Sequence, residues 1–183
     1  MRRIAAVSLV LLLGIAFLLA SALTPRLTAQ ESTPAADTAV TPIELAPGVT
    51  AEVFAGVPSA RAEGQTVYLA RFTFAPGSEI FPHSHPGTVI LGVESGTFGW
   101  TLHDGTAHVI RGAAAGGTTA EDLTEPGTEV ILNVGDAIHY EDDVVHTARG
   151  AGEEPAVVLG TLILETGQPL IMPADMEMAT PAA

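Results

Sequence analysis

The sequence predicts an all-β protein, an antiparallel sandwich or barrel built from many short strands. Several segments alternate between apolar and polar residues with a period of two, which places successive side chains on opposite faces of a strand. Turn signals rich in glycine, proline or Asp-Gly recur at a spacing of about 8–12 residues, as in all-β domains. No convincing amphipathic helix of ten or more residues is found.

The strand signals follow one another through the middle of the chain. The expected strands are residues 67–74, 88–93, 98–102, 108–111, 129–134 and 156–165. Ala75-Pro76-Gly77 ends the first strand, and Asp104-Gly105 is a strong hairpin turn signal. Residues 112–117 are expected to be a flexible glycine-alanine loop. The alternating aromatic residues are expected in the barrel interior, and they are Tyr68, Phe72, Phe74, Phe98 and Trp100.

The first 22 residues have the pattern of a secretory signal peptide. Arg2 and Arg3 precede an uncharged apolar run over residues 4–20, and Ala20-Ser21-Ala22 is a small-residue cleavage signal. We therefore expect a secreted or extracytoplasmic bacterial protein, with an uncleaved N-terminal membrane anchor as the alternative. The expected organisation is a signal peptide (1–22), a flexible linker (23–42), a barrel domain (43–172) and a C-terminal tail (173–183).

Composition restricts both the partners and the chemistry. The chain has no cysteine, so it has no disulfide and no thiolate ligand, and a metal site is limited to histidine, carboxylate and water. After removal of the signal peptide, five arginines face 21 acidic residues, a net charge near −16. Because nucleic-acid binding needs a basic surface, we expect no nucleic-acid partner, and no membrane contact after signal removal. A small-molecule ligand and a homodimer are left open.

Three histidines are the strongest functional signal. His83 and His85 are two residues apart, so both point to the same face if they lie on one strand. Two such imidazoles can share a metal ion at about 2.0–2.1 Å each. His146, from a neighbouring strand, would complete the set and leave open coordination positions. The sequence thus predicts a divalent-metal site at His83, His85 and His146.

The motifs around these histidines resemble those of the cupin superfamily. The first cupin motif is matched by Gly77, His83, His85 and Gly96, and the second by Gly135 and His146 at the correct separation. The resemblance covers residues 43–172, and it implies an antiparallel double-stranded β-helix, a jelly-roll barrel with a metal site inside.

Two departures from the cupin motifs concern the site itself. The glutamate that serves cupins as a fourth ligand is replaced by Val89, or by Ile90 in the longer spacing, while Glu94 has the wrong strand parity to substitute. In the second motif an acidic segment, residues 141–143, stands in place of Pro-x-Gly, and Gly150 in place of asparagine.

The other histidines are weaker candidates. His103 and His108 lie at or near the expected hairpin turn, where side chains usually face solvent. His139 could face the cavity as a fourth ligand or a proton shuttle. Because Tyr140 is its neighbour in an expected strand, only one of these two side chains should face inward.

The function expected from these residues is that of an exported small cupin with a three-histidine divalent-metal site. Imidazole ligands suit Fe, Zn, Cu and Ni, whereas the missing carboxylate weakens the preference for Mn. The resemblance implies an oxygenase-type small-molecule enzyme. The alternatives are a non-enzymatic barrel that holds a small ligand or a metal, and a metal-free structural barrel.

Overall fold

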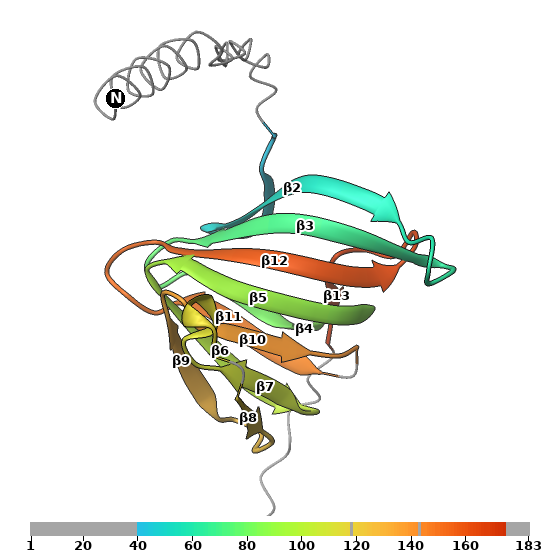
Figure 1. Ribbon diagram of the computed structural model, residues 1–183. Helices are drawn as coiled ribbons and strands as arrows, with labels where there is room; N and C mark the ends of the chain where they lie inside the picture. Colours follow the sequence, from blue (N-terminus) through green and yellow to red (C-terminus); the bar gives the residue numbers. More distant parts are fainter. Residues whose placement is uncertain (1–39, 118, 143, 175–183) are drawn as a thin grey trace, which may run out of the picture. The chain divides into compact units, whose positions relative to one another are not determined.

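The computed structural model describes residues 40–117, 119–142 and 144–174, and these form two antiparallel sheets (Figure 1). The larger sheet has the order β1 (Ile43–Ala46), β2 (Val49–Pro58), β3 (Gln65–Phe74), β12 (Ala156–Glu165), β5 (Gly87–Ser95), β10 (Ala137–Tyr140), β7 (Ala107–Ile110) and β8 (Ala120–Leu123). The smaller sheet has the order β13 (Met172–Pro173), β4 (Glu79–Ser84), β11 (Val145–Gly150), β6 (Thr97–Asp104) and β9 (Glu129–Asn133). The all-β, antiparallel prediction is confirmed.

The predicted strands are present, most with small changes at their ends. The predicted strand 156–165 is β12 itself, and the predicted strand 67–74 is β3 with two more residues at its start. The predicted turn at Asp104-Gly105 joins β6 to β7, but the predicted hairpin is wrong. The two strands do not pair, because β6 lies between β11 and β9 in the smaller sheet and β7 between β10 and β8 in the larger one. Within the expected glycine-alanine loop, Ala113–Ala115 form a single 3₁₀ turn, the only helical element among the described residues.

Part of the expected organisation lies outside the described residues, namely the signal peptide (1–22) and residues 23–39 of the linker. In the stretches that the structure does describe, no helix is long and apolar enough to span a membrane. The short strand β13 includes Pro173, so the ordered sheet extends one residue into the expected tail.

Aromatic and aliphatic side chains from both sheets form one core between them. Phe74 of β3 contacts Phe98 of β6 with ring centroids 5.1 Å apart, and Trp100 of β6 lies 5.4 Å from Tyr140 of β10. Both pairs join the larger sheet to the smaller one. The inward positions predicted for Phe72, Phe74, Phe98 and Trp100 are confirmed, and Tyr68 is partly buried against the same core. This core surrounds the histidine site.

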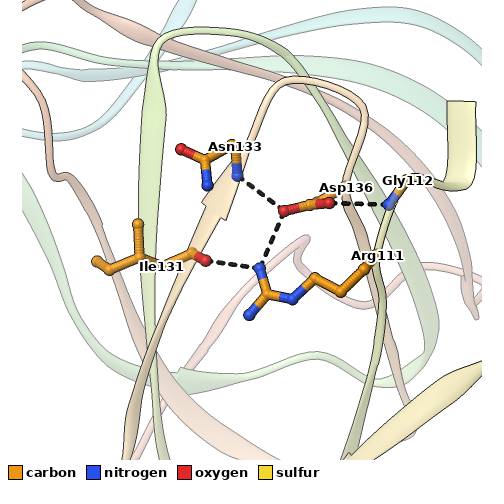
Figure 2. A network of polar contacts seen from close by, with 5 residues as sticks. All are labelled: Arg111, Gly112, Ile131, Asn133 and Asp136. Atoms are coloured by element: carbon orange, nitrogen blue, oxygen red, sulfur yellow. Dashed lines mark hydrogen bonds and ion pairs between the residues drawn. The ribbon is translucent and has the colours of Figure 1, made fainter.

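A polar network fixes the turn that leads into β10 (Figure 2). Asp136 accepts hydrogen bonds from the backbone amides of Gly112 (2.9 Å) and Asn133 (3.1 Å) and from the guanidinium of Arg111 (2.9 Å). Burial alone would raise the pKa of Asp136, but these donors and the Arg111 charge hold it below its usual value. Arg111 also donates to the carbonyl of Ile131 at 2.7 Å, so the network ties the end of β7 to β9 and to the start of β10.

Candidate metal centre

Two adjacent strands of the smaller sheet bring two of the histidines together. His83 of β4 is paired directly with His146 of β11, as the sequence predicted for a third histidine on a neighbouring strand. Residues directly opposite each other in an antiparallel pair have Cβ atoms about 4.5–5.5 Å apart. The two imidazole ring centroids are 4.3 Å apart. The register of the sheet therefore sets this contact.

His85 reaches the same group from just beyond the strand. It lies one residue past the end of β4, rather than within one strand with His83 as the sequence predicted. The chain turns at this point, since the amide of Gly87 donates to the His85 carbonyl at 2.9 Å. A Cβ atom at Gly87 (φ 147°) would lie 2.1 Å from the Ile163 carbonyl oxygen, so glycine is required for this close approach to β12. The His85 ring is 5.0 Å from His83 and 5.3 Å from His146, centroid to centroid.

The three imidazoles form a buried group of the size that one metal ion requires. His83, His85 and His146 are 3%, 5% and 1% exposed, and each offers a ligand nitrogen within 4.8 Å of the others. Three nitrogens bound to one ion at about 2.1 Å each lie about 3.0–3.6 Å apart, so movements of about 1 Å by each ring suffice for coordination. Across residues 40–117, 119–142 and 144–174 no second group of three or more histidine or acidic side chains is close enough to share an ion.

Backbone carbonyls orient all three rings in the same way. The Nδ1–H of His83 donates to the carbonyl of Phe81 at 2.8 Å, that of His85 to Leu170 at 2.6 Å, and that of His146 to Val144 at 3.4 Å. A carbonyl only accepts, so Nδ1 carries the proton in each ring and Nε2 keeps its lone pair. Metal-bound histidines usually donate their other N–H to such a partner, which fixes the tautomer. The donor set therefore fits a divalent ion.

Burial keeps these imidazoles neutral, the form that binds metal. Desolvation lowers the pKa of all three, to about 3 for His85, where the neighbouring His83 adds to the effect. The pKa of His146 is lowered further by its proximity to the other two histidines. A proton therefore competes with a metal ion for these sites only in acid solution.

Metal-free protein should lose stability as the pH falls from about 6.5. The unfolded chain then protonates its histidines near their ordinary pKa of about 6.5, while the folded site stays neutral. Because the folded-state pKa is the lower one, the contribution is fully present above pH 6.5 and is lost as the pH falls toward the folded value, about 3 for His85. For His85 alone the expected loss at pH 5 is about 2 kcal/mol. Urea unfolding of metal-free protein at pH 7 and pH 5 measures it, and a His85→Ala variant should lack this part of the change.

The ligand nitrogens face a small apolar cavity of about 30 Å³ between the sheets. Its polar lining consists of the three histidines and Tyr140, with no carboxylate and no cationic side chain. The prediction that Val89 faces the metal site and Glu94 points away is confirmed: Val89 is fully buried in the cavity wall, whereas Glu94 pairs with Arg71 on the surface at 2.8 Å. A bound ion would therefore meet no negative charge from the protein.

Tyr140 is a site residue that sequence reasoning mentioned without assigning it a role. Its hydroxyl lies 3.3 Å from Nε2 of His146, and its side chain is 1% exposed. Burial raises the pKa of Tyr140 far above its ordinary value, so the phenol stays protonated. Trp100 stacks on the other face of this cluster, with its ring centroid 4.8 Å from that of His146. One sequence signal could have identified Tyr140: neighbouring residues of a strand face opposite sides, so if His139 faces outward, Tyr140 faces the cavity.

The remaining histidines lie away from the cavity. His139 was considered as a fourth ligand, but its side chain points to the outer face of the sheet and contacts Glu141 at 3.2 Å. His108 stacks on His139 there and contacts Asp122 at 2.9 Å. His103 lies 3.4 Å from the Thr147 hydroxyl and does not line the cavity. Side chains alternate between the two faces of β10, so His139 faces outward because its neighbour Tyr140 faces inward.

Comparisons with known proteins found similar solved structures but no similar sequence family. No protein-family model matches the chain, and no curated protein sequence matches it either. Among solved structures, a cupin 2 domain-containing protein from Halorhodospira halophila matches at 15% identity with a TM-score of 0.42, over 70% of this chain and 72% of that one. The chain itself is an all-β protein of two antiparallel sheets.

Two enzymes are also among the matched structures. A DMSP lyase structure matches at 15% identity and a TM-score of 0.47, over 69% of this chain and 52% of that one. Oxalate decarboxylase from Bacillus subtilis matches at 18% identity and a TM-score of 0.47, over 68% of this chain and 28% of that one. The chain thus spans about half of the first protein and under a third of the second. At such identities and scores the matches concern the fold and not the activity.

Proposed function

We propose that this protein binds one divalent metal ion through Nε2 of His83, His85 and His146, and that a small molecule binds at the coordination positions left open. One observation carries the proposal: three buried, neutral imidazoles meet in one cavity, and each has its Nδ1–H committed to a backbone carbonyl. Without an ion, three Nε2 lone pairs are buried together, and the Tyr140 hydroxyl is hydrogen-bonded to that of His146, whereas buried polar atoms are normally paired.

The ligand set favours metals that accept imidazole. Fe, Zn, Cu and Ni fit three nitrogen ligands, whereas Mn prefers oxygen and finds no carboxylate in the cavity wall. When bound, such an ion acts as a Lewis acid that polarises the oxygen of a ligand or water. The protein supplies the fixed tautomers, the exclusion of bulk water and an apolar wall.

The proposed activity is that of an oxygenase-type small-molecule enzyme, and a non-enzymatic ligand-binding barrel is the second candidate. The composition of the cavity favours the second candidate, because its lining holds no pair of groups suited to proton transfer beyond the ligands and Tyr140.

Elemental analysis of protein purified from its native compartment tests the metal proposal. We expect about one Fe, Zn, Cu or Ni per chain, and a metal content near zero would support the metal-free structural barrel instead. Oxygen consumption by the loaded protein with a panel of small organic acids and alcohols then separates the two candidates. Turnover supports the enzyme, and saturable binding without turnover supports the binding barrel.

We also propose that the protein is exported, on the evidence of Arg2, Arg3, the apolar run 4–20 and Ala20-Ser21-Ala22. The expected mature N-terminus is Leu23. N-terminal sequencing of the protein from the culture fluid or periplasm checks this, and an intact Met1 on membrane-associated protein would support the anchor instead.

A further inference from the structure

The hydroxyl of Tyr140 makes its hydrogen bond to the atom that a metal ion would take. It lies 3.3 Å from Nε2 of His146. Because the Nδ1–H of His146 is donated to the Val144 carbonyl, Nε2 is the acceptor and the phenol is the donor. An ion bound at Nε2 uses the same lone pair, so metal binding removes the acceptor of Tyr140.

No other side chain that lines the cavity, apart from the three histidines, offers an acceptor in its place. The lining consists of apolar side chains apart from the three histidines and Tyr140, and the ion would also occupy Nε2 of His83 and His85. The Tyr140 side chain is 1% exposed, so bulk water does not solvate the hydroxyl. A buried donor without a partner is unfavourable. The acceptor must therefore arrive with the ligand of the metal.

Charge and size define that ligand. Three neutral imidazoles leave the full 2+ charge of the ion, and no carboxylate of this chain lines the cavity to offset it. A negatively charged oxygen both binds such an ion and accepts a strong hydrogen bond. The cavity of about 30 Å³, close to the volume of one water molecule, has room for the oxygen end of such a ligand.

We propose that Tyr140 donates its phenol hydrogen bond to an oxygen of a small anion bound to the metal, and thereby selects oxygen anions such as short monocarboxylates. This inference rests on the metal-binding function proposed above. Tyr140 is a ligand-binding residue in this role.

The proposal predicts effects of opposite sign for one substitution. In Tyr140→Phe, zinc should bind as tightly as in the wild type or more tightly, because no hydrogen bond to His146 has to be broken. Acetate should bind the zinc-loaded variant at least about fivefold more weakly, because the phenol donor is gone. A purely structural role for Tyr140 would weaken both.

The experiment consists of two calorimetric titrations. Zinc is titrated into metal-free protein, and acetate is then titrated into zinc-loaded protein whose zinc content has been measured. Tyr68→Phe is the matched control, since Tyr68 is the other of the two tyrosines and does not line the cavity. It should behave as the wild type in both titrations. If wild type and Tyr140→Phe bind acetate equally well at equal zinc content, the proposed role of Tyr140 is wrong, while the metal site is unaffected. Wild-type protein that takes up no zinc would overturn the metal site as well.

A second measurement avoids any substitution at the site. In the Tyr68→Phe variant Tyr140 is the sole tyrosine, so ¹³Cζ-labelled tyrosine gives a single NMR signal from its phenol carbon. We expect this signal to shift when zinc is added and to shift again when acetate is added to the zinc form. Acetate without zinc should leave it unchanged. A signal that responds to zinc and not to acetate would contradict the proposal.

Discussion

Replacing His83, His85 and His146 together by alanine should abolish stoichiometric binding of divalent metal. The three Nε2 atoms are the nitrogens proposed to bind the metal, and no carboxylate in the cavity wall can take over. Each single alanine variant should lower metal occupancy sharply, because two ligands remain where three were preorganised. Elemental analysis after dialysis against a defined free-metal concentration measures the loss.

The same variant should lose the stabilisation that metal gives to the folded state. A ligand present at about 100 times its dissociation constant stabilises the folded protein by about 2.7 kcal/mol, provided that it does not bind the unfolded chain. Wild-type protein should therefore melt at a higher temperature in zinc than in chelator, and the triple variant should not. The matched control removes the other three histidines, His103, His108 and His139, which lie away from the cavity. If this control loses its metal and the cavity variant keeps it, the site is wrongly placed.

The motif spacing predicted which histidines lie close together. The two motifs lie on strands that pair with each other, and the register of that pairing places their histidines side by side. His83 and His146 are 63 positions apart and directly paired, as the resemblance implied. The orientation of the rings could not be predicted in this way. The carbonyl that receives the Nδ1–H of His85 belongs to Leu170, 85 residues away in a segment with no motif.

Two of the strands that the sequence patterns did not predict are β2 and β13. In β2 the register against β3 shifts between Val53 and Ala55, and residues 54–58 are all exposed, so the strand shows no alternation over its second half. The two-residue strand β13 exists through its pairing with Ser84 and His83 of β4, and two residues carry no periodic signal.

The inward direction of Val89 was predicted correctly, but the reason given for it was wrong. Equal parity of residues 83, 85 and 89 holds along one strand, but β4 ends at Ser84 and β5 begins at Gly87. The inward direction of Val89 is set instead by its neighbours across β5, Leu162 of β12 and Tyr140 of β10, which also line the cavity.

Replacing Val89 by glutamate should therefore place a carboxylate in the cavity wall beside the three histidines. In metal-free protein the change should lower the free energy of unfolding by about 3 kcal/mol or more, because an unpaired carboxylate is buried among apolar side chains. With metal the carboxylate can bind the ion and offset one unit of its charge. Binding of Mn²⁺, which prefers oxygen ligands, should tighten, and Mn²⁺ should restore most of the lost stability. Melting temperatures with and without Mn²⁺, for wild type and variant, measure both effects.

Two controls separate charge from size and from strand direction. Val89→Gln has nearly the same shape without the charge, so it should be less destabilising when metal-free and should respond to Mn²⁺ much less. Ile90→Glu places the same charge one position along β5, where the side chain of Ile90 is 48% exposed, and it should leave Mn²⁺ binding unchanged. If Val89→Glu responds to Mn²⁺ no more than wild type, or if Ile90→Glu gives the larger response, residue 89 does not reach the ion. The register of β5 against β10 and β12 would then be wrong by one residue, because a shift of one exchanges the two faces of a strand.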